Sequence, residues 1–179
     1  MNSLSILVIG DVMLDEYWFG NCNKISPEAP VPITNIINKD FKVGGAGNVV
    51  LNLAEINSNV ALVSTIGKDV EGKIIKKILN NKNIDLNFKE VDGCQTIKKL
   101  RIFSKHHQMI RLDFESKKEK YKINLDNKLK KKIDAHKLVL ISDYEKGSLI
   151  EVKKIINYAK LKSKLIIIDP KGNDFSKYK

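Results

Sequence analysis

The amino-acid sequence predicts an α/β fold with a mostly parallel β-sheet and helices on both faces. Short apolar runs, typical of buried parallel strands, alternate with segments whose apolar residues recur at helical spacing. The apolar runs lie at residues 4–9, 60–66, 138–142 and 165–168. The helical segments lie at residues 49–56, 70–79, 123–134 and 148–161. Repeated strand–helix units favour right-handed crossovers and therefore parallel strands.

Acidic residues follow the predicted strands at their carboxyl ends. Asp11 and Asp15 come after the first strand, Asp143 follows residues 138–142, and Asp169 follows the last strand. The carboxyl ends of parallel strands share one edge of a sheet, and ligands bind at that edge in open α/β folds. A turn or a helix cap is the alternative role for any one of these residues. Their expected convergence predicts a binding site.

Two stretches interrupt the strand–helix alternation and predict a small β element beside the main sheet. Residues 26–32 are too rich in proline to form a helix. Strand-like alternation appears at residues 33–37, 86–91, 96–103 and 107–114. We expect these segments, within about residues 16–43 and 86–115, to pair with each other and form a lid.

Gly44, Gly45 and Gly47 come directly before the first predicted helix. Glycine permits backbone angles that other residues avoid and lets a ligand approach the main chain. A helix start adds unpaired N–H groups, which attract phosphate or an anionic oxygen. The spacing matches neither standard nucleotide-binding fingerprint, and a tight turn that only leads into a packed helix is the alternative.

The net charge of +11 does not have the distribution expected of a nucleic-acid-binding protein. The basic residues are spread along the whole chain, and of the 32 Lys and Arg residues only Arg101 and Arg111 are arginine. Nucleic-acid-binding surfaces cluster basic residues and use arginine forks. In so lysine-rich a chain, an arginine indicates a position that needs a planar guanidinium. Chance, or a structural pair with Asp113 or Glu115, is the alternative.

The sequence predicts a cytoplasmic protein without a metal site. No segment has the length and composition of a membrane span, and the N-terminal apolar stretch lacks the flanks of a signal peptide. Cys22 and Cys94 are far apart and match no metal-ligand spacing. His106 and His107 are expected to mark a turn between strands rather than a metal site.

Several stretches of this sequence resemble the D-glycero-β-D-manno-heptose-7-phosphate kinases, a group of ribokinase-like sugar kinases. The stretches are Gly10-Asp11-Val12-Met13-Leu14-Asp15, Ile25-Ser26-Pro27-Glu28-Ala29-Pro30-Val31-Pro32, Gly44-Gly45-Ala46-Gly47-Asn48, Lys99-Leu100-Arg101, Ile110-Arg111-Leu112-Asp113-Phe114-Glu115, Ser142-Asp143-Tyr144-Glu145-Lys146-Gly147 and Asp169-Pro170-Lys171-Gly172. The resemblance runs in register over nearly all of the chain. It implies a ribokinase-like fold and transfer of the ATP γ-phosphoryl group to O1 of heptose 7-phosphate with Mg²⁺. The product feeds ADP-heptose synthesis for the lipopolysaccharide core.

The resemblance implies roles on the sugar side of such a kinase. Asp11 and Asp15 are similar to the family's acceptors of sugar hydroxyl groups, which carboxylates suit because each accepts several donors. Gly44, Gly45 and Asn48 are similar to the turn on which the sugar lies.

Other candidate residues carry charge. Arg101 and Arg111 are expected to face the 7-phosphate or to stabilise the lid. Asp143, Lys146 and Lys171 are expected to contact the sugar or a phosphate. The lid of this family closes over the sugar and often pairs with a second subunit, which implies a homodimer. No nucleic-acid or membrane partner is expected.

In the family, the catalytic Asp and most of the ATP pocket lie in a part that corresponds to positions beyond residue 179. Residues 1–179 are therefore expected to be the N-terminal, sugar-binding part of a ribokinase-like kinase domain, with the C-terminal part of the fold missing and no activity alone. ATP and Mg²⁺ are expected for the full-length family rather than for this chain. The alternatives are a non-catalytic sugar-phosphate-binding or dimerising fragment, and a ribokinase-like kinase for another sugar.

Overall fold

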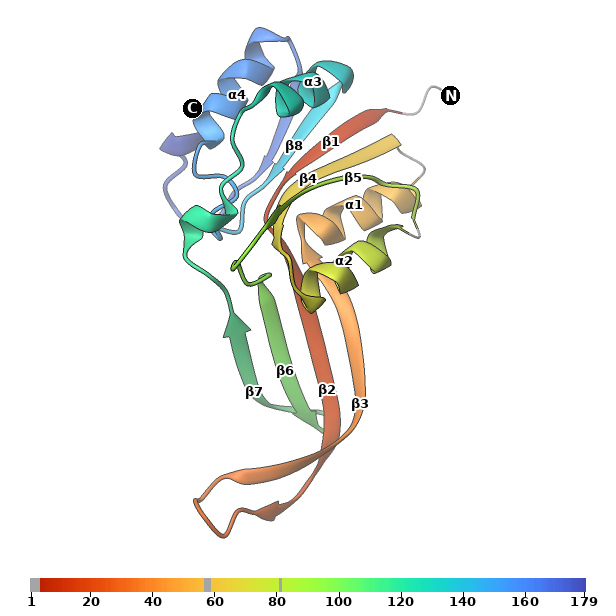
Figure 1. The fold of residues 1–179 in the computed structure, drawn as a ribbon, viewed down its shortest axis with the longest axis vertical. Coiled ribbons are helices and arrows are strands. Elements are labelled where there is room, and N and C mark those ends of the chain that lie inside the picture. The colour runs from red at the N-terminus through yellow and green to blue at the C-terminus, as the bar shows by residue number, and fades with distance from the viewer. Residues whose placement is uncertain (1–3, 57–58, 81) are drawn as a thin grey trace.

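Two β-sheets form the frame of the structure (Figure 1). The computed structural model describes residues 4–56, 59–80 and 82–179. In spatial order, the main sheet contains β5 (Asp85–Val91), β4 (Asn59–Gly67), β1 (Ser5–Gly10), β8 (Leu138–Ser142) and β9 (Leu165–Asp169). Every pair of neighbouring strands in the main sheet is parallel, which confirms the prediction.

Helices cover both faces of the main sheet because its central strand β1 is apolar on both sides. The helices are α1 (Ala46–Glu55), α2 (Val70–Asn80), α3 (Asn127–Ala135) and α4 (Val152–Leu161). Ile6 and Val8 pack in one core cluster with α1 and α2. Leu7 and Ile9 pack in a second cluster with α3 and α4 on the other face. Among the helices of the described segments, none is long and apolar enough to cross a membrane.

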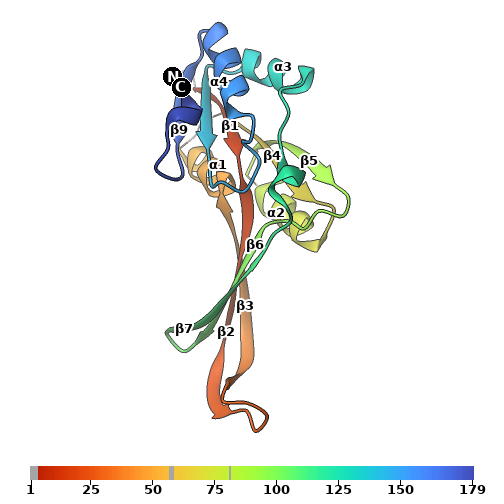
Figure 2. The same ribbon diagram turned by 90° about the vertical axis from the view of Figure 1, so that its left-hand side faces the viewer.

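A second sheet, here called the lid sheet, projects from this body (Figures 1 and 2). It contains, in spatial order, β3 (Pro32–Gly45), β2 (Val12–Ile25), β6 (Lys98–Ser104) and β7 (His107–Phe114). β2 pairs antiparallel with β3 and parallel with β6, and β7 pairs antiparallel with β6. β2 begins at Val12, only two residues after β1 ends at Gly10. The chain therefore passes directly from the centre of the body into the lid sheet.

The structure corrects the predicted extent of the lid. Residues 86–91 belong to β5, which pairs in parallel with β4 at the edge of the main sheet. Leu86 and Phe88 pack there against the first core cluster. The alternating pattern of this segment fits an edge strand of either sheet, so the pattern alone does not identify its neighbour.

Two helices begin later than predicted. The expected helix over 123–134 begins at Asn127, because the Asp126 carboxylate accepts a hydrogen bond from the Leu129 N–H at 2.8 Å and caps the helix there. The expected helix over 148–161 begins at Val152.

Candidate functional site

A pocket of about 340 Å³ opens where the lid sheet leaves the body. Its walls come from the base of β2, β3 and β6, the first turn of α1 and the loop that follows β8. This is the edge of the main sheet at which the strands end, as the positions of the acidic residues predicted. The volume lies near the lower end of the range of small-molecule sites, about 300–1,000 Å³.

Asp15 lies among several positive charges in this pocket. It is paired in register with Lys42 of β3 and with Lys99 of β6. Arg101 donates a hydrogen bond from Nη1 to Asp15 Oδ1 at 2.7 Å. Paired residues on adjacent strands point to the same face, so these side chains share one surface. Oδ2 of Asp15 has no hydrogen-bond partner among the described residues and can accept a hydroxyl group of a ligand.

Gly44 and Gly45 shape the pocket because they lack side chains. A Cβ on Gly44 would lie 2.2 Å from Asp15 Oδ2, so a larger residue would displace the carboxylate. Gly45 has a φ of 60°, and a Cβ there would lie 2.3 Å from the main-chain oxygen of Asp11. Asn48 follows in the first turn of α1 and lines the pocket with an exposed side chain.

Tyr144, in the loop after β8, contributes a wall from the body side. Burial raises the pKa of its phenol, and the negative charges of Asp169 and Asp15 raise it further. The hydroxyl group therefore stays protonated and can donate a hydrogen bond to a ligand.

Asp11 lies beneath the pocket and not on its surface. Its side chain is fully buried. Oδ2 accepts hydrogen bonds from the main-chain N–H groups of Tyr144 and Lys146 at 3.0 and 3.1 Å, and Oδ1 accepts one from Ser148 at 2.9 Å. The predicted direct contact of Asp11 with a sugar hydroxyl is therefore corrected. Asp11 positions the loop that carries Tyr144.

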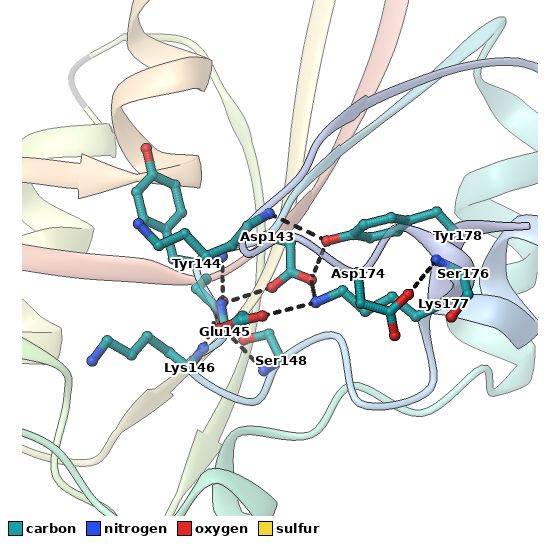
Figure 3. Close-up of polar contacts among 11 residues, drawn as sticks. Asp143, Tyr144, Glu145, Lys146, Ser148, Asp174, Ser176, Lys177 and Tyr178 are labelled. Atoms are coloured by element: carbon teal, nitrogen blue, oxygen red, sulfur yellow. Dashed lines mark hydrogen bonds and ion pairs between the residues drawn. The ribbon is translucent and has the colours of Figure 1, made fainter.

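Asp143 is also held by the protein itself (Figure 3). One carboxylate oxygen accepts the Glu145 N–H at 2.7 Å, and the other accepts the Tyr178 hydroxyl at 2.7 Å and pairs with Lys177 Nζ at 2.9 Å. These bonds tie the segment 176–178 to the loop after β8. Asp143 does not line the pocket around Asp15, and its contact with the sugar or a phosphate stays a prediction.

The pKa of Asp143 predicts a pH-dependent contribution to stability. Burial alone would raise this pKa, but the hydrogen bond from Tyr178 and the ion pair with Lys177 outweigh burial and hold it below the usual value. A group with a lowered native pKa stabilises the fold above its unfolded pKa, about 3.9, and that stability is lost as the pH falls through the native pKa. An Asp143→Asn variant is expected to lose about 2 kcal/mol of unfolding free energy at pH 7, and less as the pH falls below about 4.

Urea titrations of the wild type and the variant between pH 3 and 7 would measure this difference. Asp92→Asn is the matched control, because Asp92 pairs with Lys68 at 2.9 Å but its side chain is 81% exposed, and exposed pairs contribute about 0–1 kcal/mol. A difference between wild type and Asp143→Asn that does not change with pH would contradict the assignment.

Three predicted basic residues lie outside the pocket. Lys146 forms an ion pair with Glu115. Arg111 forms an ion pair with Asp113, with 2.9 Å between Nε and Oδ1. This is the structural pair that the sequence analysis gave as the alternative to a functional role. Lys171 is exposed and does not line the pocket. A contact of Lys146 and Lys171 with the ligand stays a prediction, as does the role of Arg111 in facing the 7-phosphate or stabilising the lid.

The structure adds pocket residues that sequence reasoning missed. They are Met13, Tyr17, Lys42, Val43, Lys99 and Tyr144. Tyr17 lies two residues after Asp15, and Lys99 lies two residues before Arg101, so strand alternation would have placed both on the ligand face. Lys42 carried no such signal, because its place beside Asp15 depends on the register between β2 and β3.

Comparisons with known proteins identify related sequences. The family described as pfkB family carbohydrate kinase matches residues 3–179. The chain is 41% identical over 179 residues to "Bifunctional protein HldE" of Histophilus somni (strain 129Pt), covering 99% of this chain and 38% of that protein. It is 44% identical over 181 residues to the protein of the same name from Actinobacillus pleuropneumoniae serotype 5b (strain L20), covering 99% and 38%. The chain thus spans less than half the length of these relatives.

Solved structures show the same fold at low sequence identity. A carbohydrate kinase from Agrobacterium tumefaciens superposes with a TM-score of 0.74 at 17% identity, covering 92% of this chain and 53% of that one. An Arabidopsis thaliana ribokinase complexed with ribose and ATP superposes with a TM-score of 0.75 at 13% identity, covering 96% and 55%. The fold is therefore ribokinase-like, as predicted.

Proposed function

This chain belongs to the pfkB family of carbohydrate kinases, and we propose that it is the sugar-binding part of an ATP-dependent heptose 7-phosphate kinase. The product of that kinase is heptose 1,7-bisphosphate, formed in the cytoplasm for ADP-heptose and lipopolysaccharide core synthesis. The motif stretches that resemble heptose 7-phosphate kinases support this substrate, as does the similarity to the HldE proteins along almost the whole chain.

The observation that carries the proposal is that one accessible carboxylate and two ammonium groups line the same pocket. The Asp15 carboxylate balances the charge of Arg101, with which it shares a hydrogen bond. Lys42 has its nearest carboxylate partner, Asp40, at 3.9 Å, and both of those side chains are at least half exposed. Lys99 forms no ion pair with any described residue. Lys42 and Lys99 therefore retain positive charge that a bound anion can neutralise.

This arrangement fits a phosphorylated sugar. Sugar hydroxyl groups donate hydrogen bonds to a carboxylate such as Asp15, and a phosphate group attracts ammonium groups. We assign the sugar hydroxyls to Asp15 and the 7-phosphate to Lys42 and Lys99. Arg101 supports Asp15 in this assignment, whereas the sequence had pointed to Arg101 and Arg111 for the phosphate or for stabilising the lid.

The phosphoryl donor of a carbohydrate kinase is a nucleoside triphosphate, and the Arabidopsis ribokinase was solved as a complex with ribose and ATP. The described parts of this chain contain no group of three or more His, Cys, Asp or Glu side chains that could hold a metal ion. We propose that Mg²⁺, the catalytic base and most ATP contacts come from outside residues 1–179. No step of phosphoryl transfer is assigned to this chain alone.

We also propose that the lid sheet pairs with the lid of a second copy. Exposed apolar side chains gather toward the far end of β2 and β3, where Ile25, Ile33 and Ile37 are 66%, 45% and 69% exposed. Such a surface is typical of a protein–protein contact. Sedimentation equilibrium of the wild type and of an Ile37→Lys variant would test this contact, since the variant is expected to remain monomeric.

Calorimetric titration of the chain with heptose 7-phosphate, and with the same heptose lacking phosphate, tests the proposed function. The wild type is expected to bind the phosphorylated sugar about 100-fold more tightly, since hydrogen bonds to charged groups contribute about 1.5–3 kcal/mol each. A Lys42→Met/Lys99→Met double variant is expected to lose most of that preference and still bind the unphosphorylated sugar.

Lys39→Met is the matched control. Lys39 lies on the same strand as Lys42, but its ammonium group lies over the Trp18 ring, 4.1 Å from the centroid. The control is expected to keep the wild-type preference. Equal affinity of the wild type for both sugars would refute the phosphate assignment, and the absence of binding to either sugar would refute the proposed function.

A further inference from the structure

A second hollow lies on the body, apart from the pocket around Asp15. Its volume is about 330 Å³, and it shares no lining residue with that pocket. It opens between the edge strand β5 and the start of α3, on the face of the main sheet that α3 and α4 cover. No residue of β5 is fully buried, which shows that the helices leave this end of the sheet partly open.

The inner surface of the hollow is apolar. Val63 of β4 contributes from the sheet, and Ile123 and Leu129 contribute from the chain before α3 and from its first turn. All three belong to the second core cluster or pack against it. A ligand with an apolar body would bury its surface against these three side chains.

The rim of the hollow carries an excess of positive charge. Three lysines line it, Lys89, Lys128 and Lys132, against one carboxylate, Asp126. Lys132 pairs with Asp85, and Lys89 donates to the main-chain oxygen of Lys122 at 3.1 Å. Lys128 is exposed and forms no ion pair within the described residues.

The one acidic group on the rim, the Asp126 carboxylate, stabilises the start of α3. The Asp126 carboxylate accepts the N–H of Leu129 and caps α3, so it does not neutralise the lysines by direct contact. The hollow therefore combines an apolar floor with an ammonium rim.

We propose that this hollow is a binding site for a small organic anion with an apolar body and one acidic group. The apolar body lies on Val63, Ile123 and Leu129, and the acidic group faces Lys128 and Lys89. A carboxylate, a sulfonate or a phosphate monoester shares the required chemistry. This inference does not depend on the sugar specificity of the pocket around Asp15.

The test uses 8-anilinonaphthalene-1-sulfonate, which carries an aromatic body and one sulfonate. Titration of the whole chain, followed by probe fluorescence and by amide chemical shifts, measures affinity and location together. We expect the largest shifts at Val63, Ile123 and Leu129, and an affinity that falls when NaCl is raised from 50 to 500 mM.

Lys128→Glu is expected to weaken probe binding about fivefold, because it replaces an attractive charge by a repulsive one. The variant should fold, because Lys128 is exposed in the first turn of α3, where an acidic residue interacts favourably with the helix dipole. Lys131→Glu is the matched control, with the same charge change on the same helix outside the hollow. Equal loss in both variants, shifts centred elsewhere on the chain, or no binding at millimolar probe would overturn the proposal.

Discussion

An Asp11→Ala variant is expected to lose about 4 kcal/mol of unfolding free energy, because each buried N–H group left without a partner costs about 1–3 kcal/mol. The Asp11 side chain is fully buried and accepts three main-chain hydrogen bonds from the loop after β8. Removal of the carboxylate leaves all three donors unpaired, and partial relaxation of the loop limits the total loss. Urea titration followed by circular dichroism measures the change.

Asp169→Ala is the control for this prediction. Asp169 also ends a strand of the main sheet at the same edge, but it is exposed. Its loss is expected to change stability by less than about 0.5 kcal/mol. If Asp11→Ala has nearly wild-type stability but binds sugar poorly, the residue contacts the ligand directly, and its assignment here as a positioning residue is wrong. If Asp11→Ala does not fold, Asp11→Asn gives a milder test, since its amide oxygen can keep part of the hydrogen bonding.

An Asp15→Asn variant is expected to bind unphosphorylated heptose about 100-fold more weakly than the wild type. In the proposed assignment the carboxylate accepts hydrogen bonds from sugar hydroxyl groups, and loss of about 3 kcal/mol of charge-assisted hydrogen bonding corresponds to this factor. The loss of affinity for heptose 7-phosphate should be smaller. The variant removes the negative charge that balances Arg101, so the pocket becomes more positive and attracts the phosphate more strongly. Calorimetric titration with both sugars measures the two losses.

Asp92→Asn is the control for Asp15→Asn. Asp92 pairs with Lys68 at 2.9 Å, its side chain is 81% exposed, and it does not line the pocket. Its replacement is expected to leave both affinities unchanged. Equal effects of Asp15→Asn on the two sugars would contradict the assignment of separate groups to the hydroxyls and the phosphate. Unchanged affinities would contradict the role of Asp15 altogether.

Part of the candidate site could be predicted from the sequence. Asp15, Gly44, Gly45, Asn48 and Arg101 were all predicted and all line the pocket. Local patterns pointed to Asp15, Gly44 and Gly45, because a carboxylate after a buried strand and glycines before a helix are both readable from neighbouring residues. The lysine bias of the chain pointed to Arg101, and Asn48 was implied by the family resemblance.

The rest of the candidate site could not be predicted, because the sequence does not show which carboxylates are buried or which groups hydrogen-bond to them. Asp11 and Asp15 stand in one short stretch and look equivalent in the sequence. The structure separates them. The loop after β8 folds over Asp11, and its N–H groups donate hydrogen bonds to the Asp11 carboxylate, whereas Asp15 lies on β2 in the lid sheet. Asp143 is similar, since its partners Lys177 and Tyr178 come from a segment more than thirty residues later in the chain.

By itself, then, the sequence determined the parallel α/β sheet, the helices on both faces, the presence of a second, smaller β element and the edge of the main sheet at which the pocket around Asp15 lies. Periodicity is a local property, and it is enough to assign strands, helices and their buried faces. Only the tertiary structure decided that β5 belongs to the main sheet and that Lys42 and Lys99 lie beside Asp15. The physical reason is that the neighbour of a strand, and the register between them, depend on contacts between residues far apart in the chain.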